Sequence, residues 1–253
     1  RELLRRCSVA EESVITTGFD PSAQIKPVEV TYSTTHTSVV LDVRGSRYAF
    51  EYPLVGKFNV ENIMCAFAIG LQLGYPAATI VEALSEAPQI PGRLERVPSD
   101  DGLDISVYVD YAHTPDALEK AIASIKAVTR GRTLVVFGCG GDRDTSKRPI
   151  MGGAALTADY AIVTSDNPRH EDPEAIIADI LPGMTAGLDR FEVEIDRRAA
   201  IARAIAIAEP GDGILVAGKG HEDYQIIGDE ILSFDDRVVV AEELQRAARK
   251  GGR

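Results

Sequence analysis

Residues 133–144 read TLVVFGCGGDRD, in which a short run of β-branched and apolar residues passes directly into a loop with three glycines. An apolar run of this length between polar segments is typical of a strand buried on both faces. Similar runs end in polar loops after Val109, Thr164, Ile195 and Ala217, and amphipathic stretches separate them. This alternation of strands and helices predicts an α/β fold with a Rossmann-like, mostly parallel, doubly wound sheet in the second part of the chain.

The pattern of apolar residues changes near Gly92, and it predicts individual helices and strands on both sides of that point. After it, strands are expected at 105–109, 133–137, 160–164, 191–195 and 213–217, and helices at 115–128, 149–156, 173–181, 197–208 and 237–249. Before it, strands are expected at 14–17, 28–32, 38–43 and 47–52, with the last two joined across Gly45-Ser46 as a hairpin, and helices at 59–73 and 76–86. Pro88 and Pro91 mark a boundary, which predicts domains at 1–90 and 91–253.

Composition narrows the class of protein. The 253 residues carry 27 Lys plus Arg against 39 Asp plus Glu, a net charge of −12 that repels nucleic acid and anionic membranes. No apolar run approaches the ~18 residues of a membrane span. Cys7, Cys65 and Cys139 are widely separated, so neither a disulfide framework nor a thiolate zinc site is indicated, and we expect a reducing cytoplasm. The chain starts without an initiator Met or a secretory signal, and we expect it to begin inside a longer protein.

Ligands of such a sheet lie beyond the carboxyl ends of its strands, so the loops there are the candidate site. In the first, Asp110 and His113 precede a helix that begins at Pro115, and they suit ribose and phosphate. Ordinary loop residues are the alternative. In the second, three glycines do not follow the dinucleotide spacing, but Arg143 stands with two further basic residues. A solvated basic cluster is the alternative there.

The third and fourth loops carry further charged residues. Asp166, Asn167 and Arg169 around Pro168 suit a zwitterion, because Asp binds an ammonium and Arg grips a carboxylate through two parallel N–H bonds. Turn chemistry alone would explain Asp166 and Asn167 but not Arg169. Residues 213–219 satisfy GxxxxGK, yet a glycine stands where a magnesium-binding Ser or Thr is required, so this is not a phosphate loop. No other segment supplies one, and no second His follows at zinc-protease spacing.

Taken in order, these loops resemble the ATP-dependent Mur ligases of peptidoglycan synthesis, most closely the branch that adds diaminopimelate. The resemblance rests on six segments, at residues 56–62, 92–95, 110–117, 138–144, 166–169 and 218–222. It implies that residues 1–90 are the remainder of a central ATPase-type α/β domain without its phosphate loop, and that 91–253 form the domain that binds the acceptor amino acid.

The resemblance also implies an activity. The expected enzyme uses ATP and Mg²⁺ to join meso-diaminopimelate to UDP-N-acetylmuramoyl-L-alanyl-D-glutamate, as a cytoplasmic monomer without nucleic-acid or membrane partners. The implied acceptor-binding residues are Arg143, Asp166, Asn167, Pro168, Arg169, Gly218 and Glu222. The implied ATP-binding residues are Asn59, Arg93, Asp110 and His113. No residue is assigned to a metal or to the chemical step.

Alternatives remain open at this point. A lysine-adding ligase or a folylpolyglutamate-type ligase would share the loops, but Arg169 matches the distal carboxylate that diaminopimelate has and lysine lacks. A non-catalytic amino-acid or nucleotide-binding module is compatible with the absent phosphate loop. For the same reason we expect this chain alone to be inactive, and we expect residues 91–92 to act as a hinge when ATP binds.

Overall fold

The computed structural model describes residues 14–99 and 102–251. Cys7 therefore lies outside the described residues, as does the first residue of the chain. The chain divides into two compact units, one through Pro88 and one from Gln89.

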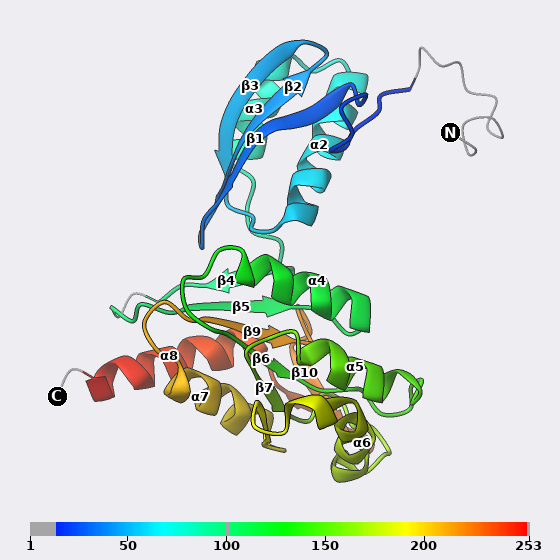
Figure 1. Ribbon diagram of the computed structural model, residues 1–253, viewed down its shortest axis with the longest axis vertical. Coiled ribbons are helices and arrows are strands. Elements are labelled where there is room, and N and C mark those ends of the chain that lie inside the picture. Colours follow the sequence, from blue (N-terminus) through cyan, green and yellow to red (C-terminus); the bar gives the residue numbers. More distant parts are fainter. Residues whose placement is uncertain (1–13, 100–101, 252–253) are drawn as a thin grey trace. The chain divides into compact units, whose positions relative to one another are not determined.

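The first unit is a three-stranded antiparallel sheet with two helices on one face (Figure 1). Its strands are β1 (Ile25–Tyr32), β2 (Thr37–Val43) and β3 (Ser46–Tyr52), and its helices are α2 (Lys57–Gln72) and α3 (Ala77–Ser85). Alternate residues of β2 point into the core, including Val39 and Leu41, where they meet Phe67 of α2. Burial of one face of each strand explains the period of two seen in the sequence.

Two local expectations for this unit are wrong. The hairpin turns at Arg44 and Gly45, with φ of 53° and 90°, and Val43 pairs with Ser46. The turn lies one residue earlier than predicted because a two-residue turn of this type needs positive φ at both central positions. The predicted strand at 14–17 is absent: Thr17 makes only an isolated bridge to Ile25, and the chain turns away at residues 18–22.

The second unit is built on a six-stranded sheet in the order β4-β5-β9-β6-β7-β8. Its strands are β4 (Glu95–Val97), β5 (Ser106–Asp110), β6 (Thr133–Phe137), β7 (Tyr160–Val163), β8 (Phe191–Val193) and β9 (Gly213–Ala217). All neighbours are parallel except β4, which pairs antiparallel with β5 at the edge. The strand β4 was not predicted, because three residues are too few to show a periodicity.

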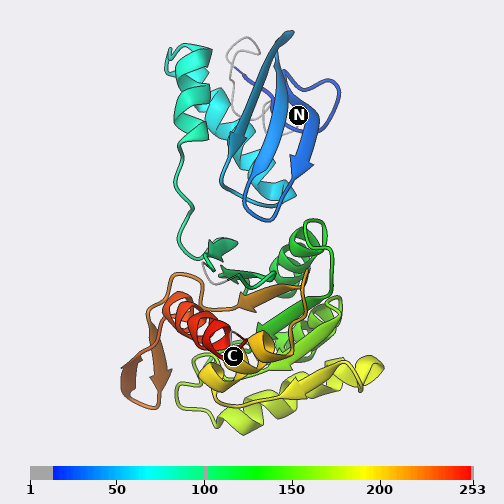
Figure 2. The same cartoon turned by 90° about the vertical axis from the view of Figure 1, so that its left-hand side faces the viewer.

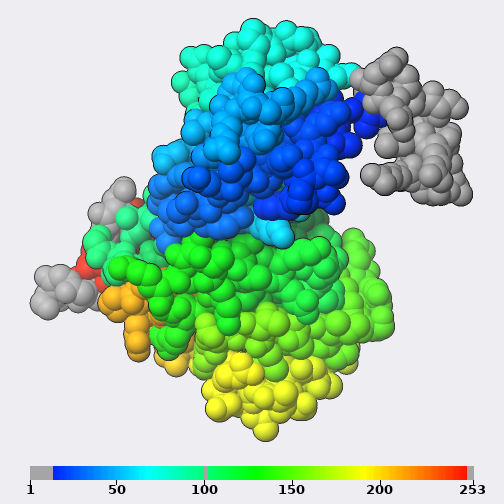
Figure 3. Space-filling model, turned by 45° about the horizontal axis from the view of Figure 1, so that its top comes forward, coloured from blue at the N-terminus to red at the C-terminus, as the bar shows by residue number. Residues whose placement is uncertain are grey.

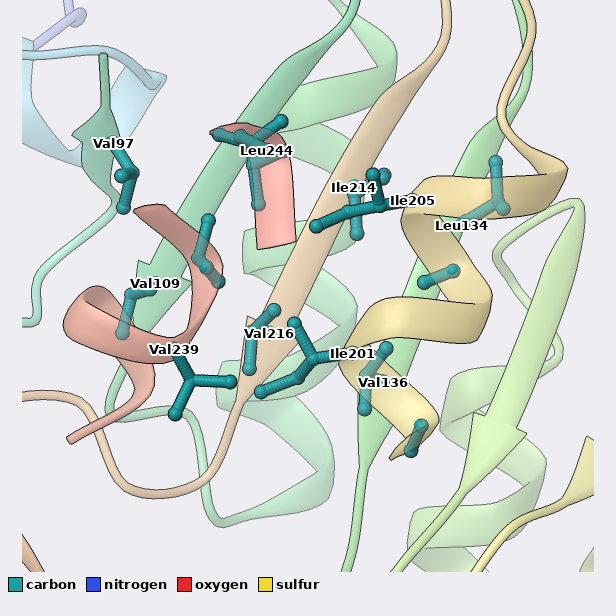
Figure 4. Close-up of a cluster of buried hydrophobic side chains, with 14 of the residues drawn as sticks. Val97, Val109, Leu134, Val136, Ile201, Ile205, Ile214, Val216, Val239 and Leu244 are labelled. Carbon is teal, nitrogen blue, oxygen red and sulfur yellow. The ribbon is translucent and has the colours of Figure 1, made fainter. Parts of the chain in front are cut away.

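Helices cover both faces of this sheet. They are α4 (Pro115–Lys126), α5 (Lys147–Ala155), α6 (Pro173–Ile180), α7 (Arg197–Ile207) and α8 (Asp236–Gly251), with a 3₁₀ segment η2 (Leu181–Gly187) after α6. The helices α4, α5 and α6 pack in sequence, and their green to yellow-green segments form one continuous surface (Figure 3). On the other face, Ile201 and Ile205 of α7 and Leu244 of α8 form one buried cluster with Ile214 and Val216 of β9 (Figure 4). The predicted doubly wound α/β fold is confirmed.

A short hairpin follows the central strand β9. Its strands β10 (Tyr224–Ile227) and β11 (Glu230–Ser233) pair antiparallel and extend outside the main sheet (Figure 2). Ile231 and Leu232 of the hairpin are exposed. The hairpin was not predicted, and its contacts with the loop after β7 bear on the candidate site below.

Candidate functional site

The candidate site lies where the parallel strands of the second unit end. The strand β9 pairs with β5 on one side and with β6 on the other, so the loops that follow these strands emerge at one edge of the sheet. The loop after β7 emerges beside the loop after β6. Ligands of doubly wound sheets bind at this edge, where strand order and chain order diverge.

The ring of Tyr111 organises the loop after β5. The guanidinium of Arg93 lies over this ring at 4.8 Å from its centroid, and the ring of His113 meets it edge-on at 4.6 Å. Both Arg93 and His113 are exposed. The structure thus gathers three of the four residues predicted to bind ATP, since Asp110 directly precedes Tyr111.

The Asp110 carboxylate is nearly buried at the end of β5. It accepts a hydrogen bond from the backbone N–H of Leu94 at 2.7 Å. Burial raises its pKa, and the hydrogen bonds from backbone N–H groups and the charge of Arg93 oppose that rise. The carboxylate also ties the segment that contains Arg93 to the end of β5.

Two glycines allow three loops to pack backbone against backbone. The carbonyl of Gly92 accepts a hydrogen bond from the Tyr111 N–H at 2.9 Å. A Cβ on Gly92, at φ 64°, would collide with the backbone of His221, and a Cβ on Gly220, at φ 56°, would collide with Tyr111. The loop that begins at Gly92, the loop after β5 and the loop after β9 therefore form one packed unit that only glycine permits.

The loop after β7 is joined to the loop after β9 by side chains. The Asn167 amide donates to Glu222 Oε2 at 2.9 Å, and Asn167 Oδ1 accepts from Lys219 Nζ at 2.9 Å and from the Ile226 N–H at 3.0 Å. Both Asn167 and Lys219 are buried, whereas Glu222 is partly exposed. The predicted acceptor residues Asn167 and Glu222 are therefore in direct contact.

Arg169 presents one edge of its guanidinium. Its Nη1 donates to the carbonyl of Gly141 at 2.8 Å, and neither Nε nor Nη2 has a hydrogen bond to any described residue. The Nε–Nη2 edge is one that can take a carboxylate through two parallel bonds. The backbone of Arg169, at φ 53°, is held by hydrogen bonds with Ile226 and Gly228 of the hairpin.

Asp166 points away from solvent, beneath Gly218. A Cβ on Gly218, at φ 118°, would collide with the Asp166 carboxylate. Burial raises the pKa of Asp166, and the charges of Arg197 and Lys219 oppose the rise. The Asp166 carboxylate therefore lies buried against Gly218 and is not exposed at the surface.

The remaining residues predicted for the acceptor site differ in their surroundings. Pro168 is buried, and its carbonyl lies against Gly141. Arg143 is exposed and donates to the carbonyl of its neighbour Asp142 at 3.0 Å. Burial raises the pKa of the Cys139 thiol in the same glycine-rich loop to about 12, which favours the protonated thiol over the thiolate.

Asn59 lies in the first unit, on α2. Its amide donates to the carbonyl of Val55 at 2.8 Å, and its Oδ1 accepts from the Asn62 amide at 3.2 Å. These bonds hold the side chain, which is buried within its own unit.

Sequence reasoning missed the charged residues beneath the loops. Arg197 is fully buried and pairs with Asp236 at 2.7 Å, while its Nη2 donates to the carbonyl of Ala217 at 3.0 Å. Arg148, one of the two basic residues grouped with Arg143 in the sequence, is buried and pairs with Glu171 at 2.8 Å, so it does not belong to a solvated cluster. A signal was present, since Arg197 and Asp236 each stand at a helix start, where a loop beside the sheet edge is expected.

Within the described part of the chain, no three or more His, Cys, Asp or Glu residues are grouped so as to hold a metal ion. No helix in that part has the length and apolar character that crossing a membrane requires.

Comparison with known proteins places these loops in a family. The family described as "Mur ligase, glutamate ligase domain" matches residues 92–220, and "Mur ligase middle domain" matches residues 1–70. The chain belongs to the Mur ligase family. The resemblance drawn from the six loop segments is confirmed.

The relatives of this Mur ligase chain include enzymes named UDP-N-acetylmuramoyl-L-alanyl-D-glutamate–2,6-diaminopimelate ligase. The one from Synechocystis is 47% identical over 89% of this chain and 45% of its own length, and the one from Gloeobacter violaceus is 46% identical over 97% and 50%. A solved structure of an enzyme of this name is 38% identical and superposes with a TM-score of 0.70 over 92% of this chain and 48% of that chain. The chain thus spans about half the length of the relatives it matches.

More distant solved structures share the fold alone. A MurF ligase from Thermotoga maritima in complex with ADP is 15% identical, with a TM-score of 0.63 over 93% of this chain and 49% of that chain. A folylpolyglutamate synthase from Mycobacterium tuberculosis is 20% identical, with a TM-score of 0.61 over 89% and 48%.

Proposed function

We propose that this chain is the acceptor-binding part of a ligase that adds meso-diaminopimelate to UDP-N-acetylmuramoyl-L-alanyl-D-glutamate. The observation that carries the proposal is the unpaired guanidinium edge of Arg169, which lies in the same loop as Asn167 of the Asn167–Glu222 pair. A guanidinium edge matches a carboxylate and a carboxylate matches an ammonium, and diaminopimelate carries both groups at its distal end. The names of relatives at 46–47% identity agree with this substrate.

The acceptor site divides the recognition among its residues. Glu222 Oε1 has no hydrogen bond to a described residue, so it is available to an ammonium while Oε2 is held by Asn167. We assign the distal carboxylate to Arg169, with the exposed Arg143 as a second cation. Gly218 leaves the backbone open beside Asp166, where a side chain would collide.

The nucleotide is assigned to the loop of the second unit that carries Tyr111. Arg93 and His113 are exposed cationic or hydrogen-bonding groups, which fits phosphate. Asp110 at a strand end fits ribose hydroxyls. Asn59 is proposed for ATP on the family resemblance alone, since its side chain is buried within the first unit. When bound, ATP would supply the phosphoryl group that activates the carboxylate of the donor substrate. Mg²⁺ is proposed for the whole ligase, and no residue described here is assigned to it.

Arg169 also bears on the alternative functions. Lysine has no distal carboxylate to pair with this guanidinium. A lysine-adding ligase would leave the guanidinium unpaired in a partly buried site, which would weaken substrate binding. The folylpolyglutamate-type reading rests on fold likeness at 20% identity alone. The proposal therefore favours diaminopimelate. A cytoplasmic location and a monomeric state are proposed with it, on the family relationship.

The domain assignment follows from the family match. We propose residues 1–90 as part of the central, ATP-binding domain and residues 91–253 as the acceptor domain. Because the sequence offers no phosphate loop, the chain by itself should show no ATPase or ligase turnover. Measurable release of phosphate from ATP by the purified chain would contradict this part of the proposal.

Direct binding tests the acceptor assignment. Calorimetry of the 253-residue chain with meso-diaminopimelate, L-lysine and L-glutamate should show binding of diaminopimelate at least tenfold tighter than of the other two. Equal affinity for L-lysine would favour the lysine-adding ligase. If the chain binds ATP but none of the three amino acids, a nucleotide-binding module would be favoured.

A further inference from the structure

Lys219 is a charged residue with no exposure to solvent. It follows β9 directly, and its side chain is 0% exposed. Transfer of an ammonium from water to a protein interior is costly unless partners compensate for it. Burial accordingly lowers the pKa of Lys219, while the charges of nearby carboxylates, Asp166 foremost, oppose that change.

The partners of Lys219 belong to the acceptor site. Its Nζ donates to Asn167 Oδ1 at 2.9 Å and lies 3.7 Å from Glu222 Oε2 and 4.0 Å from Asp166 Oδ1. The centroid of the Tyr224 ring lies 5.7 Å from Nζ. One ammonium thus contacts or neighbours three residues that the site requires.

These contacts fix the direction of the Asn167 amide. Its Oδ1 accepts from both Lys219 and the Ile226 N–H, so its Nδ2 is left to face Glu222 Oε2 at 2.9 Å. Glu222 Oε2 is therefore occupied, and Oε1 is the oxygen left for a ligand. Without the Lys219 donor, only the Ile226 N–H would hold the amide in this direction.

Lys219 reduces the excess of negative charge beneath the loops. Three carboxylates, Asp166, Glu222 and Asp236, face two cations, Arg197 and Lys219. Asp236 is already paired with Arg197 at 2.7 Å in a fully buried contact. Lys219 is then the cation nearest to both remaining carboxylates, one of which is proposed to take the ammonium of the acceptor.

We propose that Lys219 is the positioning residue of the acceptor site, which orients Asn167 and holds Glu222 ready for the ammonium of the incoming amino acid. This inference rests on the proposed function for the identity of the ligand. It assigns to Lys219 a role unlike that of a phosphate-loop lysine, since its ammonium is enclosed by the acceptor residues.

The test compares four forms of the 253-residue chain by calorimetry with meso-diaminopimelate: wild type, Lys219→Met, Glu222→Gln and the double variant. Lys219→Met should weaken binding at least tenfold, but should weaken it less than threefold in the Glu222→Gln background, because the two residues act as a unit. Lys126→Met, which removes a surface lysine paired with Asp159, is the matched control and should bind as wild type does. The double variant loses a cation and an anion together, so it is expected to fold even if Lys219→Met alone does not.

A second measurement needs no ligand. Arg197 and Lys219 favour the ionised form of Asp166, while Asp236 and Glu222 oppose it. In Lys219→Met, and also in the double variant, ¹³C NMR titration of the Asp166 carboxyl should therefore show a higher pKa than in the matching chain with Lys219. An unchanged titration, wild-type affinity in Lys219→Met, or an equal loss in both backgrounds would overturn the inference. A wild-type chain that binds no acceptor would overturn the proposed function instead, and the titration would still decide the role of Lys219.

Discussion

Replacement of Arg169 by Ala is the sharpest test of the acceptor assignment. The guanidinium uses Nη1 for the carbonyl of Gly141 at 2.8 Å and has its Nε–Nη2 edge unpaired among the described residues. If that edge takes the distal carboxylate, the variant loses a charge-assisted pair worth about 1.5 to 3 kcal/mol. Because the side chain is only partly buried, we expect about 2 kcal/mol, or roughly 30-fold weaker binding of meso-diaminopimelate.

L-Lysine provides the internal control for this variant. It lacks the distal carboxylate, so its weaker binding should be nearly the same in Arg169→Ala and in wild type. Arg169→Lys should not restore diaminopimelate binding, since an ammonium cannot form the two parallel bonds. Arg130→Ala removes an exposed guanidinium paired with Asp104 at 2.8 Å and serves as the matched surface variant.

Calorimetry with both amino acids, run beside urea unfolding, separates recognition from folding. The backbone of Arg169 has a φ of 53°, which Ala tolerates no better than Arg, so the stability change reports the lost side-chain contacts with the carbonyls of Gly141 and Asn167. The reasoning would be refuted if diaminopimelate and L-lysine lost affinity by the same factor. An equal loss of nucleotide affinity would show that Arg169 belongs to a different part of the site.

Two further predictions concern packing and pH. Gly92→Ala should lower the free energy of unfolding by about 2 kcal/mol or more, because its φ of 64° and the backbone of His221 both exclude a Cβ. The control Gly228→Ala has a φ of 58° but no atom within 4 Å, so it should show only the smaller conformational cost. Similar losses for the two variants in urea unfolding would contradict this. The pKa of His170 is raised chiefly by the hydrogen bond with Asp142, so its stabilisation is complete below the unfolded value of about 6.5 and is lost as pH rises through the folded value. His170→Gln should therefore reduce stability at about pH 5.5 and leave it unchanged at about pH 9, and an equal reduction at both would show that the charge plays no part.

Much of the second unit could be predicted from local sequence. The strands β6 and β9 coincide with the predicted runs at 133–137 and 213–217, because each is buried on both faces and is bounded by polar residues or glycine. The helix α4 begins at Pro115, as its Thr114 cap and first-turn Asp116 indicate. The hairpin of β10 and β11 could not be predicted, since its residues are mostly partly or fully exposed and show no buried face.

For the candidate site, the sequence of the loops predicted some features and not others. The motif around Asn167 and Arg169 indicated a zwitterion site, and the order of the segments identified the family. Asp166 was placed among the acceptor residues on its type and position, and the structure shows its carboxylate buried beneath Gly218. Lys219 was considered as the lysine of a phosphate loop, a pattern that Gly220 in the next position excludes.

The sequence by itself determined the strand–helix alternation, the loops that carry polar residues and the family, because periodicity, turn chemistry and motif spacing are properties of neighbouring residues. Only the tertiary structure decided which charges are buried together. Lys219 follows β9, Asn167 follows β7 and Arg197 begins α7, and these segments meet only when the sheet is assembled. The energy of a buried charge depends on partners that are distant along the chain, so its role cannot be obtained from its own segment.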